Sequence, residues 1–215
     1  MDLLAFVSQK GGVGKSTLAR LIAREYAHAG WEVKIADLDV SQGTSLHWQR
    51  RRLENKIEPH VPVEAFSSLD QALKLNGHQD VLVVDTPPNS NAGTLRVAER
   101  AHLVVLPTGL SLDDLEPGVR LAHELVKRGI EKRKIVFALC RVGGSPIEIE
   151  EARRYIQEAG YRTLAGEIPE KTAYRRASDE GRTANETRFP SLNERSDQLA
   201  QSLVDHFQQE THSAR

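Results

Sequence analysis

Short apolar runs alternate with longer amphipathic segments along most of the chain. The runs at Leu3–Val7 and Val81–Asp85 are apolar almost to their last residue, as expected of strands covered on both faces of a sheet. The strands predicted in this way span residues 3–8, 32–37, 81–85, 102–107, 134–140 and 163–167. The predicted helices span residues 15–29, 43–54, 68–75, 92–100, 112–128, 147–159, 172–180 and 192–209. This alternation predicts an α/β fold, a doubly wound, mostly parallel sheet with helices on both faces, in one domain at 1–209 with a disordered tail at 210–215.

A glycine-rich segment, KGGVGKST, lies between the first predicted strand and the first predicted helix. Glycines let backbone N–H groups turn toward a β-phosphate, and the following helix offers its positive N-terminal end. Lys15 can reach the β/γ oxygens, and the Ser16 hydroxyl can ligate Mg²⁺. The predicted phosphate-binding residues are Lys10, Gly11, Gly12, Val13, Gly14, Lys15, Ser16 and Thr17. The order of strand, loop and helix predicts a P-loop NTPase, although a strict P-loop has glycine where this chain has Gln9.

Two later strands end in aspartate. The strand at 32–37 continues into Asp39, which places an Asp-x-Asp pair at the strand's carboxyl end, the edge where open α/β sheets bind ligands. The strand at Val81–Asp85 breaks at a Thr-Pro-Pro sequence. We interpret Asp85 as the residue that holds Mg²⁺ through water, and Asp39 as the group that orients or deprotonates the attacking water.

Composition further limits the classes of function that the chain could have. The 215 residues are 39% hydrophobic and 27% charged, with a formal net charge of −1, so any nucleic-acid surface must be local. No run approaches the length of a membrane span and no signal peptide is evident, which predicts a cytoplasmic protein that does not bind membranes. Cys140 is the one cysteine, expected as a buried apolar residue, and the eight histidines lack metal-ligand spacing.

The motifs together resemble one family. KGGVGKST, DLD at Asp37–Asp39 and DTPP at Asp85–Pro88 are similar to the ParA/MinD family of deviant Walker A P-loop ATPases. The likeness is greatest to short ParA-type plasmid partition ATPases that lack an N-terminal helix-turn-helix. It extends through Leu103–Pro107, Arg141 and Ile168–Thr183, and so spans nearly the whole chain. Members often have Pro and Gln directly after DLD, whereas here Val40 and Ser41 come before Gln42.

The resemblance implies a Mg²⁺-dependent ATP hydrolase with weak basal activity. Lys10 corresponds to the family's extra lysine, which crosses the interface of an ATP-sandwich homodimer to the partner's phosphates. The implied catalytic residues are Asp39, Lys10 and Lys15, and the implied metal site is Ser16 with Asp85. Arg141 and Pro169 would border the adenine. A cation supplied by another subunit makes pairing depend on the triphosphate.

Three clusters of basic residues are candidates for contacting DNA. They comprise Lys127, Arg128, Lys132, Arg133 and Lys134; Lys171, Arg175, Arg176, Arg182 and Arg188; and Arg50, Arg51, Arg52 and Lys56. Taken alone, each is typical of a solvated face. The resemblance favours DNA binding, which we assign to Lys171, Arg175, Arg176 and Arg182. It implies a nucleoid-associated protein that segregates a plasmid or chromosome with a centromere-binding, ParB-like partner that stimulates hydrolysis.

Other functions remain open on the sequence alone. A MinD-like ATPase that positions a membrane or protein assembly is the main alternative. The helix at 192–209 has apolar Leu199, Leu203 and Phe207, but its polar face carries Asp197 and Asp205, which favours packing on the core over membrane binding. An electron-transfer ATPase needs two bridging cysteines, which the sequence lacks. A biosynthetic ligase is possible because a P-loop does not disclose the acceptor.

Overall fold

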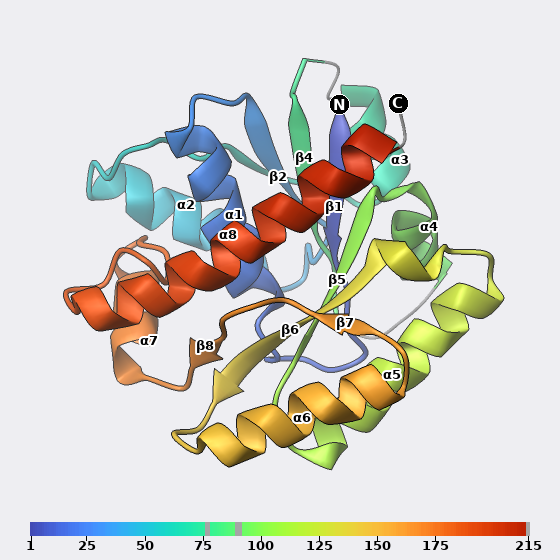
Figure 1. Cartoon of the computed structure of the whole chain (residues 1–215). Coiled ribbons are helices and arrows are strands. Elements are labelled where there is room, and N and C mark those ends of the chain that lie inside the picture. The colour runs from blue at the N-terminus through green and yellow to red at the C-terminus, as the bar shows by residue number, and fades with distance from the viewer. Residues whose placement is uncertain (76–77, 89–91, 214–215) are drawn as a thin grey trace.

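The sheet is parallel throughout its described pairings. The computed structural model describes residues 1–75, 78–88 and 92–213. Its strands are β1 (Asp2–Phe6), β2 (Val33–Asp37), β3 (Val63–Ala65), β4 (Val81–Asp85), β5 (Leu103–Thr108), β6 (Ile135–Val142), β7 (Arg162–Thr163) and β8 (Ile168–Pro169). They run in the order β3-β2-β4-β1-β5-β6-β7, and β8 pairs with β6 beyond this path (Figure 1). The predicted doubly wound, mostly parallel fold is confirmed.

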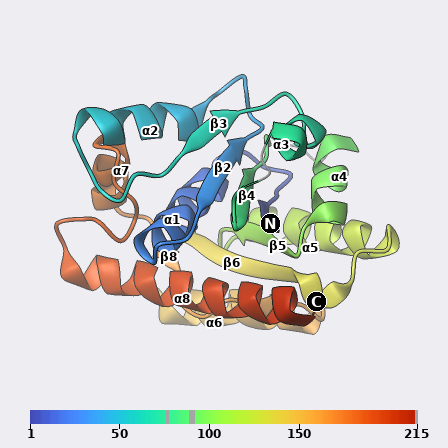
Figure 2. The same cartoon turned by 90° about the horizontal axis from the view of Figure 1, so that it is seen from above.

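Helices cover both faces of the sheet. They are α1 (Lys15–His28), α2 (Thr44–Glu54), α3 (Leu69–Leu75), α4 (Ala92–Arg100), α5 (Leu112–Lys127), α6 (Pro146–Glu158), α7 (Thr172–Asp179) and α8 (Pro190–Ser213), with a short 3₁₀ helix at Lys132–Lys134. The view from above shows α1 on one side of the sheet and α4 and α5 on the other (Figure 2). In Figure 1, α8 crosses the front of the molecule over α1.

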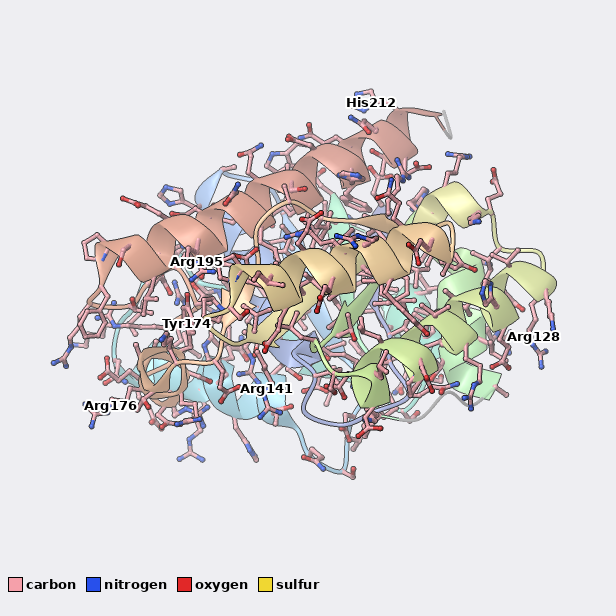
Figure 3. The ribbon with its side chains drawn as sticks, turned by 60° about the horizontal axis from the view of Figure 1, so that its bottom comes forward. Arg128, Arg141, Tyr174, Arg176, Arg195 and His212 are labelled. Atoms are coloured by element: carbon pink, nitrogen blue, oxygen red, sulfur yellow. The ribbon has the colours of Figure 1, made fainter. Side chains whose placement is uncertain are left out.

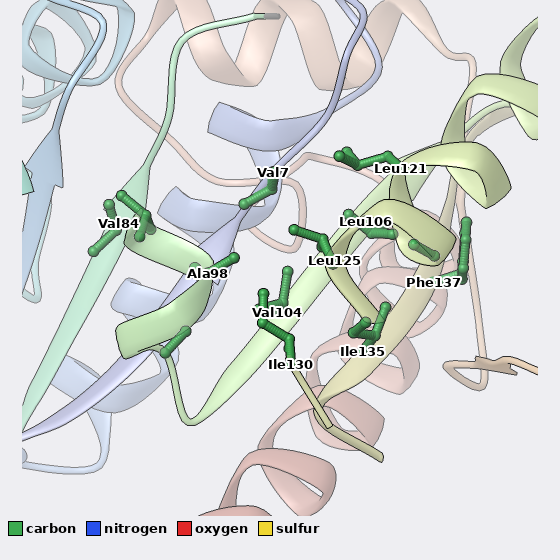
Figure 4. Packing of buried hydrophobic residues seen from close by; sticks show 14 of the residues in the cluster. Val7, Val84, Ala98, Val104, Leu106, Leu121, Leu125, Ile130, Ile135 and Phe137 are labelled. Carbon is green, nitrogen blue, oxygen red and sulfur yellow. The ribbon is translucent and has the colours of Figure 1, made fainter. Parts of the chain in front are cut away.

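Each face of the sheet has its own apolar cluster. Against α4 and α5, Val104, Leu106 and Phe137 pack with Leu125 and Ala98 (Figure 4). Against α1 and α8, the cluster includes Leu199, Leu203 and Phe207, which are at most 2% exposed. The expectation that α8 packs on the core is therefore confirmed. Among the described helices, none combines the length and apolar character needed to cross a bilayer.

The strand register brings the site residues together. Asp85, the last residue of β4, pairs with Phe6 on one side and with Asp37 on the other. Since the P-loop begins just after β1, the glycine-rich segment and both aspartate motifs meet at one edge of the sheet. Parallel strands point their carboxyl ends to the same edge, where ligands bind in folds of this class.

Three local predictions need correction. The sequence prediction missed β3, whose three residues include a central glutamate and lack an apolar run. The predicted strand at 163–167 is instead two short strands, β7 and β8, each pairing with a different part of β6. The predicted disordered tail is helical through Ser213, because Glu210 is buried and accepts hydrogen bonds from Arg133 and Arg162. Residues 214–215 lie outside the described part of the chain.

A buried ion pair fastens α2 to the segment before α8. Arg52 is 1% exposed and donates from Nη1 and Nη2 to Glu186 at 2.7 and 3.0 Å. Its remaining hydrogen bonds reach the carbonyl oxygens of Gly181 and Pro59. Each nitrogen of the guanidinium therefore has a partner close by, which is the condition for keeping such a charge in the interior.

We expect Arg52→Met to lower the free energy of unfolding by about 3 kcal/mol, because Glu186 would lose its two closest charged donors and keep Arg24, at 3.3 Å, as its cationic partner. Urea denaturation followed by circular dichroism measures this loss. Arg50→Met is the matched control on the same helix, since Arg50 is an exposed partner of Glu54 and such pairs contribute at most about 1 kcal/mol. Equal losses in the two variants would contradict the assigned role of the buried pair.

Candidate nucleotide-binding site

The P-loop closes tightly over β6. Gly14, the residue before α1, has a φ of 113°, and a Cβ there would lie 3.0 Å from both Cβ and Sγ of Cys140. A side chain is excluded by backbone conformation and by space together. Cys140 is 1% exposed, and burial raises the pKa of its thiol to about 12, so it is the apolar residue that the sequence predicted.

Lys15 points into the loop that it follows. It is 7% exposed, and its Nζ donates to Ser8 Oγ at 2.9 Å and to the Lys10 carbonyl oxygen at 3.3 Å. Burial lowers the pKa of Lys15, while the charges of Asp85 and Asp39 oppose that shift. The amine is thus held at the centre of the site, where phosphate oxygens can replace the weak neutral acceptors.

Lys10 points elsewhere. Its Nζ lies 2.9 Å from Asp114 Oδ1 near the start of α5, and the two side chains are 42% and 29% exposed. The second lysine of the motif is therefore at the rim of the site, in an ion pair within its own chain. Nothing in the sequence predicted Asp114 as its partner.

Asp37 and Asp85 form a buried pair of carboxyl groups at the sheet edge. Burial, and then the charge of Asp85, raise the pKa of Asp37 to about 6, against backbone N–H donors that include Asp39 and Ser45. Burial also raises the pKa of Asp85, although hydrogen bonds from Ser16 and Ser45 lower it in part. Two neighbouring carboxyl groups in a buried site repel each other when ionised, and binding of a cation relieves that repulsion.

The residues present fit a magnesium ion. Within the described part of the chain, Asp85 Oδ1 is buried and has no hydrogen-bond partner, although Oδ2 accepts from Ser45. The Ser16 hydroxyl also lies at this carboxylate and is 3.3 Å from Thr44 Oγ1. One hydroxyl and one carboxylate are the small protein contribution typical of a Mg²⁺ that keeps waters and phosphate oxygens as its other ligands.

The predicted phosphate site coincides with a hollow of about 300 Å³. It is lined by residues of the P-loop and by Asp39, Gln42 and Thr44 from the segment after β2. Asp39 is half-buried, and its Oδ1 accepts from Ser41 Oγ at 2.8 Å. Of the predicted phosphate-binding residues, the structure gathers Gly11, Gly12 and Gly14–Thr17 around this hollow with Asp39, whereas Lys10 and Val13 do not line it.

A second hollow, of about 400 Å³, adjoins the first because Thr17 and Arg141 line both. Pro169 lies in its wall, and Arg141 donates to the Gly12 carbonyl oxygen at 3.2 Å and to Glu170 at 2.6 Å. The expected adenine-bordering residues thus stand beside the P-loop. The size and position of this hollow suit the base of a nucleotide whose phosphates occupy the first.

The predicted DNA-binding residues gather around α7. Lys171, Arg175 and Arg182 line the second hollow, and Arg176 lies on the outward side of α7 (Figure 3). All four are exposed, but Arg175 pairs with Glu170 at 2.9 Å and Arg182 with Glu180 at 3.4 Å. The cluster is therefore a surface next to the nucleotide hollow, with some of its charge already matched by acidic residues.

Sequence reasoning missed Arg20 and Ser45, which stand behind the carboxylates. Ser45 is fully buried and joins Arg20 to Asp85 by hydrogen bonds of 3.2 and 2.9 Å. One signal was available, because Arg20 follows Ser16 by four residues and so shares its face of α1. Ser45 offered none, since its role depends on where α2 meets β4.

Comparison with known proteins places the chain in a family. The CobQ/CobB/MinD/ParA nucleotide-binding domain matches residues 4–184, so the chain belongs to this family, as the sequence motifs predicted. Protein ParA of Rhizobium radiobacter is 25% identical over 81% of each chain. The iron-sulfur cluster transfer protein NUBPL of Dictyostelium discoideum is also 25% identical, over 84% of this chain and 68% of that protein.

Solved structures share the fold. The septum site-determining protein MinD of Pyrococcus horikoshii OT3, in complex with Mg-ADP, superposes with a TM-score of 0.72 and 18% identity. The superposition covers 94% of this chain and 95% of that one. At this level of identity, the likeness shows a shared fold and nothing more.

Proposed function

We propose that the protein is a ParA-type partition ATPase. ATP and Mg²⁺ bind at the P-loop, two ATP-bound copies pair, and the dimer binds nucleoid DNA without sequence preference. A centromere-binding, ParB-like partner stimulates hydrolysis and so releases the plasmid or chromosome cargo. The observation that carries this proposal is the different placement of the two lysines of the motif. Lys15 is buried and points into the loop of its own chain, whereas Lys10 lies half-exposed at the rim, where a second copy could be reached.

The chain's own residues support ATP hydrolysis. Backbone N–H groups of the P-loop and Lys15 bind the β- and γ-phosphates, and Ser16 with Asp85 holds the metal side. Magnesium, when bound, neutralises charge on the β- and γ-oxygens. Asp39 orients the attacking water, and Lys10 of a second copy reaches the terminal phosphate. The Mg-ADP complex of the MinD relative supports this choice of cofactors.

DNA is the binding partner that fits the protein's charge distribution best. The net charge of −1 leaves no general attraction for phosphates, but the α7 cluster concentrates cations on one side, and pairing would double it. The apolar residues of α8 are buried against the core, which disfavours the MinD-like alternative in which a C-terminal helix binds a membrane. Liposome flotation in the presence of ATP tests that alternative.

Iron–sulfur transfer, which the name of the NUBPL relative suggests, is poorly supported here. Clusters of this kind are held by cysteine thiolates. The sequence has one cysteine, and Cys140 is buried beneath the P-loop with its pKa raised by burial to about 12. A cluster needs several ionised thiolates, whereas Cys140 is a single cysteine whose thiol stays protonated at neutral pH.

DNA retention across a salt series tests the proposal. We expect retention of random-sequence duplex with ATP, and much weaker retention with ADP or without nucleotide. Arg176→Ala should flatten the log–log salt dependence by about 0.9 for each phosphate contact that it removes. Arg128→Ala is the matched control, since Arg128 is exposed at the opposite end of the molecule in Figure 3. Equal retention with ATP and ADP, or a loss only in the control variant, would contradict the proposal.

A further inference from the structure

Arg20 occupies an unusual position, because it joins the metal side of the site to a helix on the far wall of the second hollow. It lies on α1 and is 8% exposed. Its Nε donates to Ser45 Oγ at 3.2 Å, and Ser45 Oγ in turn donates to Asp85 Oδ2 at 2.9 Å. Its Nη1 donates to Ser178 Oγ on α7 at 3.1 Å.

The charges around Arg20 make it sensitive to a cation at Asp85. Burial lowers the pKa of Arg20 to about 10, while the negative charges of Asp85 and Asp37 stabilise the guanidinium. A divalent cation beside Asp85 would offset that attraction and repel Arg20. In a buried site such a change is only weakly screened by solvent.

Two further contacts restrict where Arg20 can go. Its guanidinium lies 5.8 Å from the centre of the Trp48 ring, and Arg52 lies 5.3 Å from the same ring. The buried Arg52–Glu186 pair closes that side. The remaining hydrogen bond of Arg20 goes to Ser178, near the end of α7. Arg51 Nε donates to the Ser178 carbonyl oxygen at 3.3 Å, and its positive charge opposes that of Arg20.

We propose that Arg20 is a positioning residue that couples magnesium occupancy of the Ser16–Asp85 site to the position of α7. The inference rests on the proposed function in one respect, since it requires that a magnesium nucleotide binds. With a magnesium ion at that site, Arg20 would lose its hydrogen bond to Ser45 and keep its existing one to Ser178, which would tighten α7 against α1 and α2. By reciprocity, any ligand that favours the tightened α7 also favours magnesium binding. Arg175 and Arg176 lie on this helix, so their placement follows the state of the metal site.

Hydrogen exchange at α7 tests the coupling without relying on turnover. Exchange of the amides of residues 172–179 is compared at saturating ADP, with Mg²⁺ or with EDTA. In the unmodified protein we expect Mg²⁺ to slow exchange in α7 by about fivefold or more, the lower end of typical coupling between sites. Ser178→Ala removes the acceptor and should abolish this slowing. Thr172→Ala on the same helix should retain it, because Thr172 is exposed and contacts Arg175 but not Arg20.

Trp48 supplies a second readout. The sequence has two tryptophans, so Trp31→Phe leaves Trp48 as the single emitter beside Arg20. Adding Mg²⁺ to the ADP complex should shift its emission, and Arg20→Lys should remove the shift, because an ammonium cannot reach Ser45 and Ser178 together. Arg50→Lys is the control and should keep the shift, because Arg50 is exposed on the helix that carries Trp48 and pairs with Glu54.

The outcomes separate the inference from the proposed function. If a fluorescent ADP analogue does not bind at all, the proposed function fails. If it binds, but α7 in Ser178→Ala responds to Mg²⁺ as the unmodified protein does, the coupling through Arg20 is overturned. An α7 that ignores Mg²⁺ in the unmodified protein overturns it equally.

Discussion

Lys10→Ala should abolish ATP-dependent pairing and reduce ATP turnover by about 10³-fold or more, because a cation supplied in trans to a terminal phosphate contributes about 10³–10⁵ in rate in related chemistry. Binding of ATP by the single chain should persist, since Lys15 and the P-loop backbone remain. Sedimentation velocity and steady-state ATPase assays measure the two effects. The removed amine is half-exposed and touches Asp114, so the fold should be unaffected.

Substitution of Asp114 is the control, because it should strengthen pairing of the two copies where Lys10→Ala weakens it. Asp114→Ala frees the Lys10 amine from its intrachain ion pair and should tighten pairing by up to about fivefold for each lysine, since an exposed pair contributes at most about 1 kcal/mol. Lys10→Ala protein that pairs as well as the unmodified chain would show that Lys10 does not reach across an interface.

Asp39→Ala should slow hydrolysis by about 10²–10⁴-fold, the contribution typical of a positioned acid or base. The carboxylate lines the hollow and accepts hydrogen bonds from the Ser41 hydroxyl and the Gln42 backbone N–H, both outside the P-loop, so nucleotide affinity should change by only a few-fold. Single-turnover hydrolysis and ATP binding measured on the same protein separate the two quantities. The paired, ATP-bound state should accumulate as a result.

A matched change for comparison is Asp205→Ala, which removes an exposed carboxylate on α8 that accepts from Gln201. It should leave both hydrolysis and binding unaltered. If the Asp39 variant hydrolyses ATP within threefold of the unmodified protein, then water is oriented by another group and the assignment of Asp39 is wrong.

Local patterns account for what the sequence predicted well. The P-loop is recognised from neighbours within eight positions, and the carboxyl ends of parallel strands necessarily share an edge. Asp37, Asp85 and the glycine-rich loop could therefore be placed together from the sequence alone. The same reasoning fails for β3, where three residues carry too little periodicity to signal a strand.

Contacts between distant segments account for what was missed. Arg20 and Ser178 are 158 positions apart, and Lys10 and Asp114 are 104 apart, so each pair depends on how complete helices pack. The last turn of α8 was predicted as part of a disordered tail because the ends of a chain are often poorly ordered. It is ordered by Arg133, just before β6, and by Arg162, the first residue of β7, which give Glu210 its partners.

The mass of the Asp39→Ala protein in solution tests most directly whether the terminal phosphate drives pairing. Light scattering with Mg²⁺ and ATP should give twice the 23.9 kDa of one chain, whereas Mg²⁺ and ADP should give the single-chain mass. Adding Lys10→Ala to this variant should return the ATP sample to the single-chain mass. The same mass with ATP and with ADP would contradict the account.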